Sequence, residues 1–466
     1  MKKIQKFLVF VLVLSMTFGI SGCLREKAPA QKKVLKSVDL VYYKMFDDED
    51  AISPIIQDYQ AKNPGVRVHY KKFTDFEEYM ETIVNELAEG EGPDIFSVQN
   101  TWFTGNLKKL IPMPSAYATS NDFDQTYVDV AAQDMIHADE VGVPRIYGIP
   151  MTIDTLAIFY NKDHYSDRVP GVGRPGTTWS ELGEHVAELT EEDDSYEHFE
   201  VAGIAMGRAD NITRAVDILY LLMMQLGTVF YDDKLEHATF ATSAKEALEY
   251  FISFADEESD HYSWNKYISD PESEEKEITT FAKGKTSMII GYSYTYDQIL
   301  NEIARLKKNG EDAISPSAIR VAPMPQMSNA ATDKRITYAS YFAETVSRTS
   351  KNPEEAWNFL IHLGSKESLQ KYNDATKKPT SRRDLIEDQK LDPTYGVFVN
   401  QIGHAESFPI FNYHKYKEIF TDAIQEALAT SNVTTALKAA EAKIDKLIPQ
   451  KPLFIKQEPD ETETAT

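Results

Sequence analysis

The sequence predicts an α/β fold with at least two domains, and three observations support this prediction. Strand-like and helix-like segments alternate over the first hundred residues in the order β-α-β-α-β, which is typical of a parallel sheet covered by helices. The chain has 466 residues, which is long for a single hydrophobic core. Hydrophobic residues make up 42% and charged residues 26% of the chain, as in an ordinary soluble globular protein.

The N-terminal elements follow from local residue patterns. Strands are expected where β-branched and aromatic residues are frequent, at 38–46, 66–73 and 93–100. The segment 51–65 looks helical, with Pro54 in its first turn and a stop at Asn63-Pro64-Gly65. The segment 76–92 has apolar residues at the i, i+3, i+4, i+7 spacing of an amphipathic helix.

The remaining elements are less regular. We expect strand-like segments at 147–161 (two short runs), 201–207, 317–327 and 336–347. We expect helices at 178–190, 214–227, 244–254, 353–363, 367–373, 415–430 and 434–447. The helix at 214–227 is apolar nearly all round, which indicates a core helix. The segment 281–299, "FAKGKTSMIIGYSYTYDQI", reads as a strand that runs into a helix.

The first residues predict a secretion signal. Lys2, Lys3 and Lys6 precede the apolar run Phe7–Ile20, which is too short to span a bilayer comfortably. The run ends in Ile20-Ser21-Gly22-Cys23, which resembles the bacterial lipobox, and Cys23 is the only cysteine. We therefore expect a lipoprotein signal peptide at 1–22, lipidation of Cys23 with palmitate-type chains, and a polar tether at 23–36 to the membrane.

Charge and composition exclude several kinds of function and site. A net charge of −24 argues against nucleic-acid binding, which needs a basic surface. A single cysteine allows neither an internal disulfide nor a thiolate metal site in the folded part. No other segment reaches membrane-spanning length, so the body is expected to be soluble, and the polar residues 450–466 predict a disordered tail.

Enzyme motifs are missing. "GKT" at 284–286 lacks the glycine and the preceding strand of a phosphate loop. The sequence has no HExxH, GxSxG or GxGxxG, and its ten histidines lack metal-ligand spacing. We expect neither a cofactor nor a metal, and no enzyme activity, although sequence alone leaves a pair of catalytic carboxylates open.

Aromatic residues are more informative than the enzyme motifs. Several cluster where turns are expected: Tyr42, Tyr43, Phe46, Trp102, Tyr292, Tyr294, Tyr341, Tyr413 and Tyr416. A sugar ring has an apolar face rimmed by hydroxyls, so its site needs a flat aromatic ring beside carboxylates or amides. The aromatic residues are consistent with such a site.

Four stretches together resemble the extracellular solute-binding proteins of bacterial ABC importers, in the branch of maltose-binding protein. They are "IIQDYQAKNPGVRVHY" (55–70), "GPDIFSVQN" (92–100), "YGIPMTIDTLAIFYNKDHY" (147–165) and the segment 281–299. With the lipobox, they occur in the family's order and at its separations. The resemblance covers about residues 38 to 447.

The resemblance implies a two-lobed periplasmic-binding-protein-like fold, with mixed sheets, flanking helices and a hinge that the chain crosses several times. It places lobe 1 at 35–152 plus 318–365, and lobe 2 at 153–317 plus 366–449. It implies a monomeric, extracytoplasmic, lipid-anchored receptor that captures a carbohydrate, such as an oligosaccharide, in the cleft between the lobes. Its partner would be the ABC permease in the membrane.

Site residues are implied residue by residue. Asp154 stands where the maltose binder has a ligand-binding glutamate, and Tyr294 where it stacks a tryptophan on its sugar. Tyr292 departs from the family pattern in a way that narrows the cleft, and Tyr296 is expected to pack. The other candidate ligand-binding residues are Asn100, Trp102, Arg208, Asn211, Tyr341, Tyr413 and Tyr416.

Three alternatives stay open. Relatives bind ferric ion through paired tyrosines, or polyamines through acids and aromatic rings, so this chain could be a receptor for either. A secreted glycoside hydrolase is the third alternative, and the missing nucleophile and metal motifs argue against it.

Overall fold

The computed structural model describes residues 37–193, 198–327 and 334–449. The strands are β1 Val38–Met45, β2 Val66–Phe73, β3 Ile95–Gln99, β4 Ile136–Ala138, β5 Pro144–Ile146, β6 Ile149–Pro150, β7 Ala157–Asn161, β8 Glu191–Glu192, β9 Phe199–Val201, β10 Met288–Gly291, β11 Ile319–Pro323, β12 Thr337–Tyr338, β13 Phe342–Val346 and β14 Ala405–Glu406.

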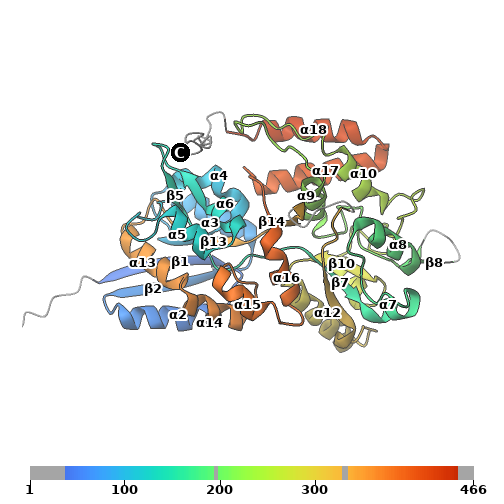
Figure 1. Cartoon of the computed structure of the whole chain (residues 1–466), viewed down its shortest axis with the longest axis horizontal. Helices are drawn as coiled ribbons and strands as arrows, with labels where there is room; N and C mark the ends of the chain where they lie inside the picture. Colours follow the sequence, from blue (N-terminus) through green and yellow to red (C-terminus); the bar gives the residue numbers. More distant parts are fainter. Residues whose placement is uncertain (1–36, 194–197, 328–333, 450–466) are drawn as a thin grey trace, which may run out of the picture. The chain divides into compact units, whose positions relative to one another are not determined.

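Helices carry most of the remaining chain (Figure 1). The α-helices are α2 Glu49–Lys62, α3 Phe76–Ala88, α4 Phe103–Asn106, α5 Ser120–Thr126, α6 Asp129–Met135, α7 Lys162–Arg168, α8 Trp179–Leu189, α9 Ala215–Gln225, α10 Lys245–Ser253, α11 Glu277–Ala282, α12 Thr295–Asn309, α13 Pro353–Leu363, α14 Lys366–Thr376, α15 Ile386–Gln389, α16 Gly396–Gln401, α17 Tyr413–Thr430 and α18 Val433–Asp445. Short 3₁₀ turns are η1 Asn100–Trp102, η2 Leu107–Lys109, η3 Pro316–Ala318, η5 Arg383–Leu385 and η6 Ile402–His404.

The first large sheet has the strand order β2-β1-β3-β13-β6. Strands β2 and β3 pair with β1 in parallel, while β13 pairs antiparallel with both β3 and β6. The β-α-β-α-β prediction is therefore confirmed, and a strand from about 250 residues later in the chain completes the sheet. The residues of β3 are all buried, as expected for a central strand covered on both faces.

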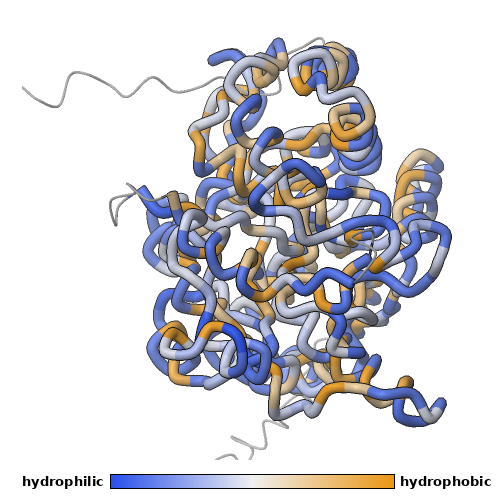
Figure 2. Tube along the Cα trace, turned by 90° about the vertical axis from the view of Figure 1, so that its right-hand side faces the viewer, coloured by the Kyte–Doolittle hydropathy of each residue, from blue (hydrophilic) through white to orange (hydrophobic). Residues whose placement is uncertain are grey.

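The second sheet has the order β10-β7-β11 and is antiparallel throughout. Every residue of β7 and β10 is buried. Helix α9 lies in the same hydrophobic cluster as these strands and is buried along most of its length, as its all-round apolar sequence predicted. Along the helical turns, apolar and polar residues alternate (Figure 2), as expected for amphipathic helices that cover a core.

Helix starts agree with capping rules. The Asp75 side chain accepts a hydrogen bond from the Glu78 backbone N–H at the start of α3. Thr178 and Glu181 form a capping box at the start of α8, in which each side chain accepts a backbone N–H of the other residue. These local signals explain why the starts of α3 and α8 could be predicted within one residue.

The strand predicted at 201–207 is wrong. Strand β9 ends at Val201, and beyond it only Ala202 forms a bridge, with Thr286. The stretch is nevertheless buried. An apolar run indicates burial, but it does not distinguish a strand from a buried irregular segment.

Two hydrophobic clusters divide the described residues. One cluster contains β1, β2, β3 and β13, and in the first third of the chain its last core residue is Ile153. The other cluster begins at Leu156 and contains β7, β10 and α9. The chain passes between the clusters near 154–155, near 338–339 and near 405–408, and in α16 Phe398 belongs to the second cluster while Val399 belongs to the first. Repeated crossings of this kind are what the resemblance implied for a hinge.

The two clusters divide the chain differently from the predicted lobe boundaries at two places. Strand β11, from the segment predicted to return to lobe 1, pairs with β7 of the second sheet. Helix α14, predicted for lobe 2, contacts α2, and in Figure 1 it lies beside the strands of the first sheet. Local sequence does not reveal this because both placements depend on long-range packing.

Within the described residues, no helix has both the length and the apolar character needed to cross a membrane. The predicted signal peptide, lipidated Cys23, tether and C-terminal tail lie outside the described residues.

Candidate binding site

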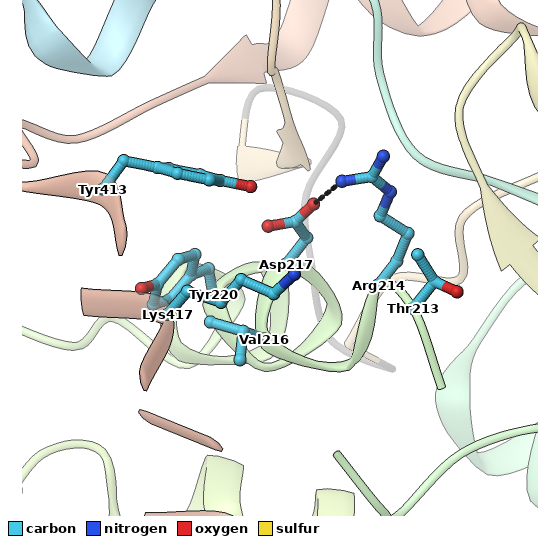
Figure 3. A pocket seen from close by; sticks show the side chains of 7 residues that line it. All are labelled: Thr213, Arg214, Val216, Asp217, Tyr220, Tyr413 and Lys417. Carbon is cyan, nitrogen blue, oxygen red and sulfur yellow. Dashed lines mark ion pairs between the residues drawn. The ribbon is translucent and has the colours of Figure 1, made fainter. Parts of the chain in front are cut away.

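A small pocket opens at the beginning of helix α9 (Figure 3). Its empty volume is about 240 Å³, which includes space open to solvent. The lining residues are Thr213, Arg214, Val216, Asp217, Tyr220, Tyr413 and Lys417. Helix α9 contributes its first turns, and α17 contributes Tyr413 and Lys417.

An ion pair with aromatic neighbours forms the polar centre of this pocket. Arg214 Nη1 lies 3.7 Å from Asp217 Oδ2, which is beyond hydrogen-bond distance. Figure 3 shows the Arg214 guanidinium and the Tyr413 hydroxyl pointing toward the Asp217 carboxylate from opposite sides. An arginine held loosely by its partner keeps N–H donors available to a ligand oxygen.

Two rings of the β10–α12 connection pack against the Arg214 cation. The guanidinium carbon lies 5.4 Å from the ring centroid of Tyr292 and 5.6 Å from that of Tyr294, within the range of cation–π attraction. The two rings stack with centroids 5.8 Å apart. The Tyr292 hydroxyl donates to Asp217 Oδ2 at 3.1 Å, so Tyr292 orients the carboxylate while Tyr294 stays half-buried.

Burial and charge set the ionisation of this pair. Burial raises the pKa of the Asp217 carboxyl, and the nearby Arg214 and the Tyr292 hydrogen bond oppose that shift. Burial acts to lower the pKa of Arg214, but Tyr294 and Asp217 outweigh it, so its pKa is raised. The guanidinium is therefore permanently charged, and it stabilises the neighbouring carboxylate.

Aromatic rings from the first cluster approach the pocket from another direction. Trp102 lies with its ring centroid 6.0 Å from that of Tyr413 and 4.8 Å from that of Phe76. Tyr413 contacts both hydrophobic clusters. Tyr413 thus lies between the α9 pocket and Trp102, which follows the end of β3.

Two buried donors near the pocket are unused. Within the described part of the chain, neither the Trp102 indole N–H nor the Tyr220 hydroxyl has a hydrogen-bond partner. An unpartnered buried polar group costs stability. Such groups beside a pocket are expected where a ligand or ordered water completes the hydrogen bonding.

Asp154 lies at the crossing between the two clusters. Its carboxylate accepts hydrogen bonds from the Ser293 backbone N–H at 3.0 Å and the Ser293 hydroxyl at 2.6 Å, and from the Thr155 N–H at 3.0 Å. Burial raises the pKa of the Asp154 carboxyl to about 6, although these hydrogen bonds act to lower it. In this structure Asp154 therefore positions the turn that carries Tyr292 and Tyr294.

Other predicted residues are occupied by structural contacts. Asn100 and Tyr341 both hydrogen bond to the buried Asp134. Asn211 accepts from the Trp264 indole N–H and donates to the Asn265 and Ser269 carbonyls.

Arg208 and Tyr416 also have protein partners. Arg208 pairs with Asp210, and the hydroxyl of the buried Tyr416 contacts that of Tyr231. Of the predicted site residues, the structure therefore brings Tyr292, Tyr294, Tyr413 and Trp102 toward the pocket, and Asp154 behind it. The ligand-binding role of each residue stays a prediction.

Arg214 and Asp217 were missed by sequence reasoning. A signal was present, because they are the two charged residues of the otherwise apolar segment 214–227. A charged pair in the first turn of a core helix is unusual, and it points to a polar function at that end of the helix.

The described residues contain no group of three or more His, Cys, Asp or Glu side chains that could hold a metal ion. The pocket lining instead combines aromatic and hydroxyl groups with the Arg214–Asp217 pair, Lys417 and Val216.

Two α/β clusters linked by repeated chain crossings, with an aromatic and polar pocket whose Tyr413 ring packs against both, are typical of a ligand-binding protein of the two-lobed type. The family model of bacterial extracellular solute-binding proteins matches residues 47–370, well over half of the chain. The chain therefore belongs to this family.

Distant relatives agree with this assignment. A Brucella abortus protein named only as a binding protein is 21% identical over 395 residues, which cover 84% of this chain and 88% of that protein. The galactooligosaccharide-binding protein of Bacillus subtilis is 23% identical over 176 residues, 36% of this chain and 38% of that protein.

Solved structures share the fold. A solute-binding protein of an ABC transporter from Thermotoga lettingae, bound with α-D-tagatose, has a TM-score of 0.67 at 19% identity, covering 89% of this chain and 100% of that one. The sugar-binding protein MalE from Xanthomonas citri has a TM-score of 0.68 at 14% identity, covering 88% and 97%. The predicted two-lobed periplasmic-binding-protein-like fold is thus confirmed.

Proposed function

We propose that this protein is the carbohydrate receptor of a bacterial ABC importer and that it binds its sugar at the α9 pocket. The observation that carries the proposal is the Arg214–Asp217 pair, which faces Tyr413 and is flanked by Tyr292 and Tyr294. Charged donors and acceptors beside aromatic faces match a ring with hydroxyls at its rim and an apolar face.

The relatives support a sugar as ligand. The partial relative from Bacillus subtilis is named for galactooligosaccharides, and structures with the same fold hold tagatose, acarbose and maltotetraose. Delivery to a membrane permease is the role that the ABC transporter relatives suggest for this chain. Lipid anchoring through Cys23 completes the proposal and rests on the lipobox-like sequence.

Charge in the pocket disfavours the cationic alternatives. Arg214 lies against both Tyr292 and Tyr294, so its positive charge would repel a ferric ion or a polyamine bound at these rings. The nearest carboxylate, Asp217, already faces Arg214 and is not free to neutralise a second cation. A neutral sugar meets no such repulsion.

The hydrophobic clusters suggest revised lobes. We place lobe 1 at about 38–153 plus 339–405 and lobe 2 at about 156–338 plus 408–448, following most residues of each cluster; Phe398 of α16 is the exception, because it packs in the second cluster. The crossings near 154–155, 338–339 and 405–408 would act as the hinge. Opening there would enlarge the pocket for entry, and closing would enclose the sugar.

Calorimetry of the purified protein with a panel of mono- and oligosaccharides tests the proposal. A sugar found to bind should bind at least tenfold more weakly to Arg214→Ala, because its hydroxyls lose charged donors. Arg208→Ala is the matched control, since Arg208 pairs with Asp210 and does not line the pocket. If no sugar in a broad panel binds, the proposal is wrong, and equal losses in both variants would place the site elsewhere.

A further inference from the structure

Residues 407–410, which we call the strap, lie between β14 and α17 and contact both hydrophobic clusters. No residue of the strap belongs to a helix or strand, so its position depends on contacts with its neighbours. Three of its four residues are nevertheless buried. Tyr413, three residues after the strap, begins α17 and lines the α9 pocket. The strap therefore leads directly into the pocket lining.

Polar groups of the strap bind the first cluster. The Ser407 hydroxyl donates to Oδ1 of the buried Asp134 at 2.6 Å, and the Ile410 N–H donates to the Thr101 carbonyl at 2.9 Å. Asp134 lies in α6 and Thr101 in η1, and both elements contribute core residues to the first cluster. Both ends of the strap are therefore tied to that cluster.

Apolar side chains of the strap pack in the second cluster. Phe408 and Ile410 are buried members of it. The Phe408 ring stacks on Phe230, with the ring centroids 3.8 Å apart and the planes 11° from parallel. The Tyr231 hydroxyl donates to the Pro409 carbonyl at 2.6 Å, and Tyr231 also belongs to the second cluster. The same four residues are thus held by both clusters.

Asp134 connects the strap to another crossing of the chain. Its carboxylate also accepts the Tyr341 hydroxyl at 2.7 Å and the Asn100 side-chain amide at 2.9 Å. Tyr341 follows the crossing at Ala339, whose N–H donates to the Glu406 carbonyl at 2.9 Å. A buried carboxyl group needs its donors, because a buried polar group without partners costs stability. Asp134 therefore holds two crossings against the first cluster.

We propose that the strap latches the second cluster to the first, so that the lobes open only when Ser407 leaves Asp134 and Ile410 leaves Thr101. If both hydrogen bonds persisted during opening, Phe408 would have to leave its packed position and expose apolar surface. A segment tied to one cluster alone would travel with that cluster and would not resist opening. This inference rests on the hinge of the proposed function and does not depend on which ligand binds.

Hydrogen–deuterium exchange of the purified full-length protein, followed by mass spectrometry of short peptides, tests the latch. A protected amide exchanges in proportion to the population of molecules in which it is opened. Ser407→Ala should speed exchange at the Ile410 and Ala339 amides about five- to tenfold, the effect of losing one buried hydrogen bond. Ser97→Ala is the matched control, because the Ser97 hydroxyl donates to the buried Glu344 at 2.9 Å within the first sheet; it should leave both amides unchanged.

A second pair of variants tests the apolar contacts of the strap. Phe408→Leu keeps an apolar side chain but loses the stacked contact with Phe230, so exchange at the same two amides should rise about two- to tenfold. Phe420→Leu is the control, because its ring packs on Phe240 in the second cluster with centroids 5.2 Å apart and lies outside the strap. It should leave both amides unchanged.

Three outcomes would overturn the inference. Faster exchange at Ile410 alone would show that the strap loosens locally while the lobes stay together. Unchanged exchange in Ser407→Ala, or an equal change in Ser97→Ala, would show that the strap does not hold the clusters together. The measurement uses no sugar, so failure to bind any sugar would refute the proposed ligand and leave this test intact.

Discussion

At the scale of single residues, Tyr294 and Tyr296 lie two positions apart but have different surroundings. Tyr294 packs on Tyr292 and the Arg214 cation, while Tyr296 contacts Tyr395 with ring centroids 6.1 Å apart. The resemblance implied that Tyr294 stacks on the sugar and that Tyr296 packs. The structure places the Tyr294 ring beside the pocket, and it packs the Tyr296 ring against Tyr395 at the start of α16.

This difference leads to a matched pair of variants. Tyr294→Ala should weaken sugar binding by about 1–3 kcal/mol, because a ring at a desolvated site is lost, while the unfolding temperature changes little. Tyr296→Ala should leave affinity unchanged. Titration calorimetry measures both, and a larger effect at Tyr296 would mean that the sugar lies on the other side of α12.

Asp154 gives a pH-dependent prediction for stability. Its pKa is raised from 3.8 to about 6 in the folded state by burial, so between these values the folded protein holds a proton that the unfolded chain has lost. This contribution to stability is present at low pH and is lost as pH rises toward about 6, by an amount on the order of 1–3 kcal/mol.

Asp154→Asn tests this, since the amide cannot titrate but keeps nearly the same shape. The free energy of unfolding of wild type relative to Asp154→Asn should fall as pH rises from about 4 to about 6. Urea unfolding at several pH values measures it. A difference that does not vary with pH, or that rises, would show that the Ser293 and Thr155 hydrogen bonds keep Asp154 ionised throughout.

At the scale of elements, the sequence could predict features that depend on local signals. It could not predict features that depend on long-range contacts. Helix α13 was predicted at its observed bounds, and β1 and β2 within one residue, because periodicity and capping act over a few residues. The pairing of β13 with β3 joins segments about 250 residues apart, and no local pattern encodes that register.

The site shows the same limit. Tyr294 could be singled out from its own segment, but the contact of Arg214 with that ring joins residues 80 positions apart in the sequence. Sequence reasoning selected Arg208 as a site residue and missed Arg214. Only packing shows that Arg208 faces Asp210 and that Arg214 faces the pocket.

Helix α3 offers a prediction at this scale. Asp75 accepts the Glu78 N–H at 2.7 Å as N-cap, so Asp75→Ala should cost about 1 kcal/mol of unfolding free energy. Asp48 is the control, because it occupies the N-cap of α2 without a side-chain capping bond. Chemical unfolding of both variants measures this, and an equal cost for Asp48→Ala would contradict the capping assignment.

At the scale of the whole molecule, the fold and the proposed anchor have separate roles. The described residues form the body that we propose binds a sugar, with two clusters and a pocket whose lining comes from α9 and α17. The proposed lipid attachment at Cys23 precedes this body by more than ten residues. Location and binding should therefore respond to different substitutions.

Cys23→Ser tests that separation. In a bacterial host, the wild-type protein should sediment with membranes and dissolve only with detergent, because an anchor of more than one acyl chain holds it stably. Cys23→Ser should appear in the fraction free of membranes and bind sugar with unchanged affinity, since the pocket residues begin nearly 200 positions later. Gln31→Ser, which changes the tether and keeps the cysteine, should stay with the membranes. Membrane retention of Cys23→Ser would show that another segment, or a bound partner, holds the protein there.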